Sequence, residues 1–164
     1  MSPQLSQDEG DVTIHHMAPP IEVSVLVKAP LARVWAELAD FASHPQWMDD
    51  AATVRFLTDR TTGLGTRIEV ATRVGPLRAT DVMEVVRWEE ERTIVVEHVG
   101  AVKGYGTFDL GPSGDSTEMR WVEDLRFPWW MGGPVGLAVA RPILRRIWRG
   151  SVMRLKERVE LSGP

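Results

Sequence analysis

Residues 21–47 read IEVSVLVKAPLARVWAELADFASHPQW, and the clearest indication of the architecture lies in this stretch. Apolar and polar residues alternate over residues 21–28, which predicts a strand. Ala29-Pro30 ends that strand, and Pro30 suits the first turn of a helix in which a Val-Trp pair and a Leu recur at helical spacing. A second short helix is predicted around Pro45-Gln46-Trp47. The chain is therefore expected to begin with one strand and two short helices.

The remainder of the chain divides into a β-rich part and a helical part. From about residue 52 to residue 127, short β-rich runs alternate with turn signals, which predicts an antiparallel meander of about six strands. Residues 134–160 carry one apolar stripe at helical spacing, which predicts a long helix, and Pro142 predicts a kink or a fresh start within it. The expected fold is α+β: a curved seven-stranded antiparallel sheet wrapped around the long C-terminal helix, with space left between them.

Composition sets limits on the class of protein. A chain of 164 residues is expected to form one domain, here over residues 21–160, preceded by a flexible polar tail over residues 1–20. A net charge of -4 does not favour nucleic-acid binding, and the absence of cysteine excludes disulfides, thiolate catalysis and cysteine-based zinc sites. No apolar run approaches the roughly 18 residues of a membrane span, and no secretory signal begins the chain. A cytoplasmic location is expected.

Several motifs in their joint order resemble the START/Bet v 1-like superfamily, in particular its polyketide cyclase/dehydrase and lipid-transport group. The resemblance covers about residues 20–160, and it rests on the opening stretch at residues 25–47, on three turn or strand motifs and on the C-terminal Leu155-Lys156. The three motifs are Gly63-x-Gly65-Thr66, Gly104-x-Gly106-x-Phe108 and Gly114-Asp115-Ser116-Thr117. The resemblance implies a helix-grip fold with an internal cavity. It implies no particular reaction, because such domains include carriers, receptors, aromatase/cyclases and chaperone cofactors.

Strand alternation places three polar residues on the otherwise apolar inner face of the sheet: Asp81, His98 and Glu123. Turns centred on Glu89-Glu90, near Ala101 and near Ser113-Gly114 predict that Asp81 lies opposite His98, His98 opposite Gly104, and Gly104 opposite Glu123. The three side chains would then lie at one height on the concave face. Alternatively, each could lie at a strand end in water, or on the outer face if a bulge shifts the alternation.

The predicted ligand-binding residues lie on the inner face of the strands, in the segment that follows them and on the long helix. They are Met83, Val96, Gly104, Gly106, Phe108, Met119, Trp121, Leu125, Trp129, Trp130, Leu144 and Trp148. The sequence Trp129-Trp130-Met131-Gly132-Gly133 suggests a mobile aromatic flap at the cavity mouth. The alternative is that one of its rings fills the core while the other caps the helix.

Three functions remain open. The first is binding of a hydrophobic small molecule, polyketide-, isoprenoid- or lipid-like, in the cavity. The second is a cofactor-independent cyclase, aromatase or dehydratase, with His98 and Glu123 as base and acid and Asp81 orienting His98. The third is a partner-binding module without a ligand. No metal or cofactor motif is present.

A group of four arginines on the long helix could contact a membrane surface or a carrier protein, or could form a solvated helix face. They are Arg141, Arg145, Arg146 and Arg149. The chain is expected to be a monomer or a homodimer.

Overall fold

The computed structural model describes residues 19–162, so nearly all of the tail predicted over residues 1–20 lies outside the described residues. This described part of the chain contains seven strands: β1 (Ile21–Val27), β2 (Ala51–Phe56), β3 (Arg67–Val74), β4 (Leu77–Glu89), β5 (Thr93–His98), β6 (Lys103–Ser113) and β7 (Ser116–Arg126). The helices are α1 (Leu31–Ala39), the 3₁₀ helices η1 (Phe41–Gln46) and η2 (Trp129–Met131), and α2 (Gly133–Leu161).

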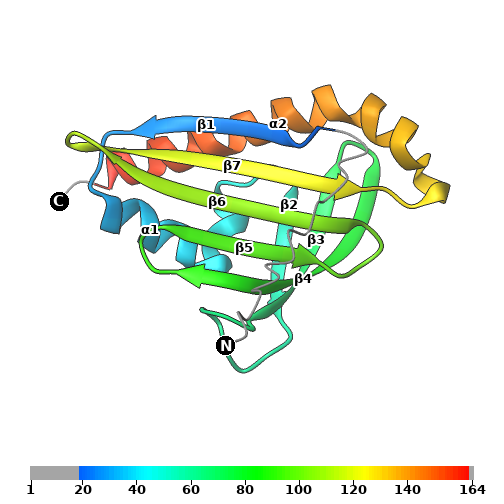
Figure 1. The fold of residues 1–164 in the computed structure, drawn as a ribbon, viewed down its shortest axis with the longest axis horizontal. Helices are drawn as coiled ribbons and strands as arrows, with labels where there is room; N and C mark the ends of the chain where they lie inside the picture. The colour runs from blue at the N-terminus through cyan, green and yellow to red at the C-terminus, as the bar shows by residue number, and fades with distance from the viewer. Residues whose placement is uncertain (1–18, 163–164) are drawn as a thin grey trace, which may run out of the picture.

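The strands form one antiparallel sheet in the order β1-β7-β6-β5-β4-β3-β2. The sheet is strongly curved, and α2 runs along it beside β1 (Figure 1). The predicted α+β helix-grip fold is therefore confirmed, with one strand and two short helices ahead of the six-stranded meander. Within the described residues, no helix is long and apolar enough to cross a membrane.

The two halves of α2 are held differently. Near its C-terminus, Arg33 donates to the carbonyl of Val159 at 2.6 Å, and Lys156 donates to the carbonyl of Leu26 at 2.8 Å. These contacts fasten that half to α1 and β1. Near its N-terminus the helix bends in the region of Pro142 (Figure 1), but it continues through the proline as one helix rather than starting afresh.

Across two hairpins, the pairing of the strands is shifted from the one that the sequence predicted. Met83, rather than Asp81, lies opposite His98, and Gly106, rather than Gly104, lies opposite Glu123. A register irregularity between Val85 and Arg87 and a turn at residues 90–92 account for the first shift. Each shift moves the pairing by two residues, so every side chain stays on its predicted face.

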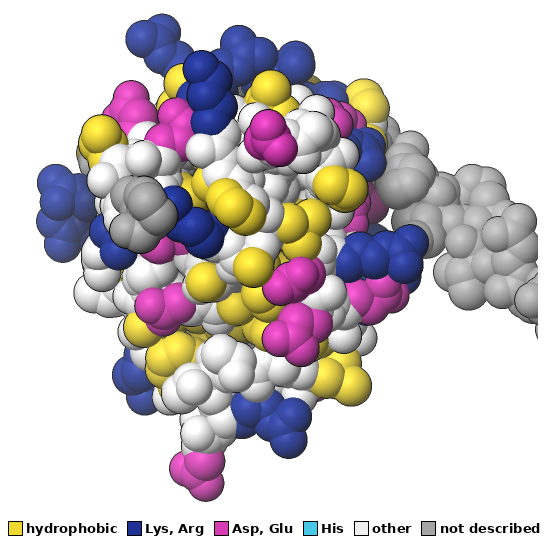
Figure 2. All heavy atoms as spheres, turned by 90° about the vertical axis from the view of Figure 1, so that its left-hand side faces the viewer, with side chains coloured by type: hydrophobic (Ala, Val, Ile, Leu, Met, Phe, Trp, Pro, Cys, Tyr) yellow, Lys and Arg dark blue, Asp and Glu magenta, His cyan; other side chains and the backbone are white. Residues whose placement is uncertain are grey.

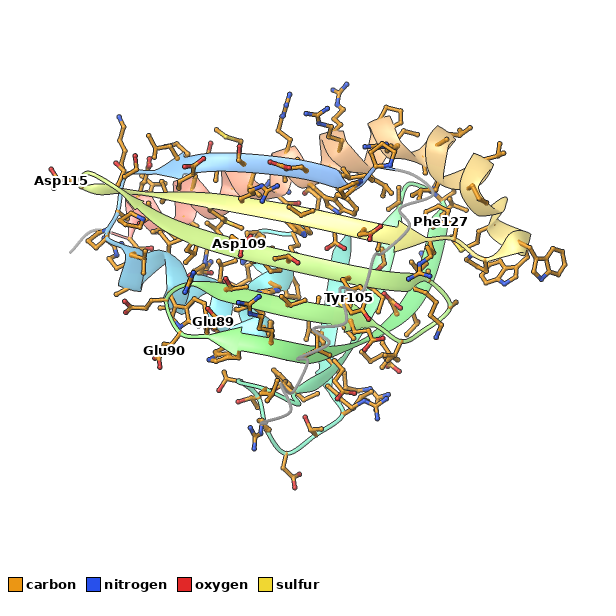
Figure 3. The ribbon with its side chains drawn as sticks, in the orientation of Figure 1. Glu89, Glu90, Tyr105, Asp109, Asp115 and Phe127 are labelled. Carbon is orange, nitrogen blue, oxygen red and sulfur yellow. The ribbon has the colours of Figure 1, made fainter. Side chains whose placement is uncertain are left out.

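The hairpins define two ends of the molecule. The end of β4 at Glu89, the β4–β5 turn that begins at Glu90 and the β6–β7 turn at Asp115 lie at one end, whereas Phe127 marks the other end, where β7 leads towards α2 (Figure 3). Residues of β6 alternate between the two faces: Tyr105 and Asp109 lie on the outer face, and Gly106 and Phe108 lie on the buried inner face.

Aromatic rings connect the sheet to the helix. The ring of Trp121 on β7 lies 5.1 Å from that of Phe108 on β6 and 5.2 Å from that of Trp148 on α2, measured between centroids. A second cluster packs Trp88 of β4 against Trp35 of α1, with centroids 5.1 Å apart. Such ring pairs stabilise a core beyond the area they bury. They hold α2 and α1 at fixed positions over the sheet.

A buried hydroxyl closes the junction between β1, α1 and β7, and it provides a test of the fold. The Thr117 hydroxyl, which is fully buried, donates to the carbonyl of Ala29 at 2.9 Å. Thr117→Val should lower the free energy of unfolding by about 1–3 kcal/mol in urea titrations, because that carbonyl is left unsatisfied. Thr53→Val, at an exposed position of β2, should leave stability nearly unchanged. Equal effects of the two substitutions would contradict this account.

Candidate functional site

A cavity of about 290 Å³ lies between the concave face of the sheet and the N-terminal half of α2. Its wall is built mainly from apolar side chains of β2 to β7, of η1 and of α2. At its open side, Leu77 at the start of β4 and Ile143 of α2 both line the cavity and are exposed. The space expected between sheet and helix is therefore present, and it opens between the β3–β4 hairpin and α2.

Asp81, His98 and Glu123 meet on the wall of this cavity. His98 lies between the two carboxylates: its Nδ1 is 2.5 Å from an Asp81 oxygen and its Nε2 is 3.1 Å from Oε2 of Glu123. All three side chains are buried. The prediction that these three polar side chains lie together on the inner face therefore agrees with the structure, whereas their roles stay a prediction. Asp81 was expected directly opposite His98 and lies diagonally from it, and Glu123 lies diagonally from His98 across β6.

The contact between His98 and Glu123 spans an intervening strand. His98 is on β5 and Glu123 on β7, so their backbones are two strand spacings apart, about 9.6 Å. On β6 between them, Gly106 carries no side chain, and a Cβ there would lie 2.6 Å from Oε1 of Glu123. A glycine at this position therefore lets the glutamate side chain lie across β6 and reach the imidazole.

The electrostatic environment makes His98 a cation at neutral pH. Burial opposes the charged form, but hydrogen bonds and attraction from Asp81 and Glu123 outweigh it and raise the pKa of His98 to about 10. An imidazole whose pKa rises on folding stabilises the protein fully below its unfolded pKa of about 6.5. That contribution is lost as the pH rises through about 10.

Because both ring nitrogens of His98 donate to carboxylates, the imidazole has no free nitrogen for a ligand. Glu123 is the member that remains available. It accepts from His98 and, through Oε1, from the indole N–H of Trp121 at 2.7 Å, and a carboxylate has further acceptor positions. The expected pairing of His98 as base with Glu123 as acid is therefore replaced by a different geometry: Asp81 and His98 orient Glu123.

Further polar residues line the cavity, and sequence reasoning assigned none of them to it: Asp50, His44, Thr72 and Arg78. Asp50 accepts from the indole N–H of Trp148 at 2.9 Å through Oδ2, while Oδ1 is buried with no hydrogen-bond partner. Burial raises the pKa of Asp50 above its usual range, and the nearby charge of Glu123 adds to this despite the opposing Trp148 hydrogen bond. Asp50 directly precedes β2, where no strand alternation indicated its direction.

His44 of η1 is the second missed residue. Its Nε2 donates to the carbonyl of Leu38 at 2.9 Å, and the side chain is buried at the cavity wall. Burial lowers the pKa of His44 to about 4, so the ring is neutral at pH 7. The chain thus places a neutral histidine and a cationic histidine on the same cavity.

Most of the predicted ligand-binding residues lie on the cavity wall. Those that line it are Met83, Val96, Phe108, Trp121, Leu125, Leu144 and Trp148. Met119 is instead fully buried in the core. Gly104 and Gly106 are buried on the inner face of β6 without lining the cavity.

The predicted aromatic flap is oriented differently. Trp129 and Trp130 are both exposed and do not line the cavity; Met131 lines it instead. The reason is a tight turn in which Gly133 donates to the carbonyl of Pro128 at 3.1 Å and Gly132 adopts a left-handed conformation. Neither ring fills the core, so the alternative expectation is not met either.

Within residues 19–162, no group of three or more His, Cys, Asp or Glu side chains has an arrangement suited to a metal ion. Asp81, His98 and Glu123 satisfy one another, and their contacts are hydrogen bonds. Their arrangement is therefore that of a charge-assisted network.

The role of Gly106, whose missing side chain lets Glu123 reach across β6, can be tested by adding one methyl group. Gly106→Ala should displace the Glu123 carboxylate and weaken its contact with His98, so the pKa of His98 should fall from about 10 towards its ordinary value. An NMR titration of the imidazole measures this. Gly111→Ala on the same strand is the control, since a Cβ there meets nothing within 4 Å. An unchanged titration in Gly106→Ala would exclude this role for the glycine.

Comparisons with known proteins extend these observations. No curated protein matches the sequence. Solved structures share the fold at 15–18% sequence identity. One is a protein from Thermus thermophilus, with a TM-score of 0.74 and 16% identity, and the match covers 89% of this chain and 100% of that chain. A START superfamily protein from Mycobacterium smegmatis has a TM-score of 0.74 and 17% identity, and the match covers 89% of this chain and 100% of that chain. The Zhui aromatase/cyclase from a Streptomyces species has a TM-score of 0.65 and 18% identity, with 86% of this chain and 93% of that chain covered. The family model for polyketide cyclase/dehydrase and lipid transport matches residues 19–160, and the chain belongs to this family.

Proposed function

We propose that the protein binds a compact apolar small molecule, polyketide- or isoprenoid-like, that carries a hydroxyl or carbonyl oxygen. The observation that carries the proposal is the Glu123 carboxylate: it is buried, oriented by His98 and Trp121, and lies on the wall of a mainly apolar cavity. Apolar burial supplies affinity at about 25 cal/mol per Å². A hydroxyl that donates to Glu123 would orient the ligand.

The size and lining of the cavity support a ligand of limited length. About 290 Å³ is close to the lower end of the range for small-molecule sites. Such a volume suits a folded or cyclic skeleton better than an extended acyl chain. A partner-binding module without a ligand has less support, because a collapsed interior would serve that purpose equally well.

A second candidate function, acid–base conversion of the bound molecule, is favoured by the presence of two carboxyl groups, Glu123 and Asp50, on the wall of one cavity. In a β-hydroxy ketone, Glu123 would take the proton next to the carbonyl, and Asp50, in its acid form, would give its proton to the departing hydroxyl. A carbon–carbon double bond forms, the carbon–oxygen bond breaks, and water leaves. The raised pKa of Asp50 suits a proton donor, and the buried Oδ1 has no other partner.

Ligand binding can be tested by reducing the space available. Ala140 of α2 lines the cavity, so Ala140→Phe should weaken binding of the neutral fluorophore phenylnaphthylamine about tenfold or more, which corresponds to about 1.4 kcal/mol. Ala138→Phe, at an exposed position of the same helix that does not line the cavity, is the matched control. Fluorescence titration measures both. Equal affinities in the two variants would show that the probe binds elsewhere.

The acid–base candidate has its own test, with a phenyl-substituted β-hydroxy ketone whose dehydration produces an ultraviolet-absorbing enone. Glu123→Gln and Asp50→Asn should each lower the rate by about 10² to 10⁴, because each removes one proton-transfer group. Binding of phenylnaphthylamine and the urea midpoint provide the controls for folding. If the parent protein binds the ketone and produces no enone, the acid–base candidate is rejected and the binding proposal stands.

A further inference from the structure

An exposed apolar tip lies at the end of the molecule where the cavity opens. It consists of Trp129 (87% exposed) and Trp130 (60%) in η2, and of Val135 (73%), Val139 (69%) and Ile143 (54%) on α2. The last three recur every four residues, so they form one stripe on the outward side of the helix. Surface residues of this size are normally scattered rather than gathered. This gathering marks a surface that contacts something apolar.

The next turns of α2 add positive charge and no negative charge. Arg145, Arg146 and Arg149, together the arginine collar, are exposed, and none forms a salt bridge within 4 Å with a residue of the described chain. Arg145 is close enough to β1 to contribute, after Arg120, to the lowered pKa of Glu22. Arg141 differs, because it donates to the carbonyl of Pro20 at 2.8 Å. No Asp or Glu occurs over residues 133–156. At the opposite end of the molecule, acidic and basic side chains are interspersed (Figure 2).

We propose that the apolar tip and the arginine collar form a docking surface for an anionic lipid bilayer. Tryptophan favours the boundary between headgroups and hydrocarbon, and the stripe on α2 would lie at the same depth. The collar would then be at the level of the anionic headgroups. The helix lies in the plane of the interface rather than crossing it, consistent with the absence of a membrane-spanning helix in residues 19–162.

Charge argues against a second copy of the chain as the occupant. A symmetric dimer through this surface would place two arginine collars side by side, whereas an anionic bilayer neutralises them. An acidic carrier protein would satisfy the collar but would not need two projecting indoles. The bilayer accounts for both features.

Docking would bring the cavity mouth to the bilayer. Ile143 belongs to the apolar tip and also lines the cavity, and Met131 of η2, adjacent in sequence to Trp130, lines it as well. An apolar ligand could therefore pass between bilayer and cavity without crossing bulk water. This consequence rests on the proposed binding function, but the docking surface itself does not.

Co-sedimentation with vesicles tests the proposal. The parent protein should bind vesicles made of phosphatidylcholine and phosphatidylglycerol in a ratio of three to one. Its affinity for vesicles of phosphatidylcholine alone should be lower, by about fivefold for each arginine that lies near the membrane surface. The double substitution Trp129→Ser/Trp130→Ser should weaken binding to the anionic vesicles about tenfold or more. Arg145→Gln/Arg146→Gln/Arg149→Gln should remove the preference for them.

Matched controls use exposed residues elsewhere. Leu57→Ser/Leu64→Ser removes exposed apolar side chains, and Arg55→Gln/Arg73→Gln/Arg92→Gln removes three exposed charges; both should leave vesicle binding unchanged.

Failure of the parent to bind either vesicle would overturn the proposal. So would a dimer, seen by analytical ultracentrifugation, that only the tryptophan variant disrupts. Vesicle binding by Ala140→Phe, in which the cavity is filled, separates docking from ligand binding.

Discussion

A carboxylate buried inside a protein needs hydrogen-bond donors or a positive charge beside it, and in this protein the buried carboxylate of Glu123 has this need. The surrounding residues are arranged to meet it. Trp121 donates to one oxygen, His98 to the other, and Asp81 holds the far side of the imidazole. Gly106 leaves the gap through which the carboxylate reaches across β6. Because Trp121 also packs against Trp148 of α2, the same cluster that satisfies the charge holds the helix over the sheet.

The helix α2 performs two different tasks along its length. Its C-terminal half is attached to β1 and α1 by hydrogen bonds from side chains to backbone carbonyls, and these bonds fix the position of that half of the helix. Its N-terminal half borders the cavity on one side and faces solvent with apolar residues on the other. Arg141 anchors that half by donating to the carbonyl of Pro20, just ahead of β1. The more lightly anchored half is therefore the one that borders the entrance to the cavity.

The candidate site was predictable to the extent that strand alternation is reliable. Alternation depends only on parity, so a register error of two residues still placed Asp81, His98 and Glu123 on the inner face. Their actual contacts are diagonal, and neither the irregularity between Val85 and Arg87 nor the turn at residues 90–92 is visible as a pattern. Asp50 was missed because it precedes its strand, and the outward direction of Trp129 depends on a backbone turn.

The sequence by itself determined the element order, the α+β class, the inner face of the strands β4 to β7 and the identity of the three polar residues on that face, and its family resemblance indicated the helix-grip fold. The element order and the strand faces follow from local periodicity, which the chain carries regardless of its surroundings. Only the tertiary structure decided which atoms meet: that His98 is shared by two carboxylates, that its pKa is raised to about 10, and that Asp50 joins the cavity. Such contacts depend on side chains from distant strands and on burial, and both arise only when the sheet curves around α2.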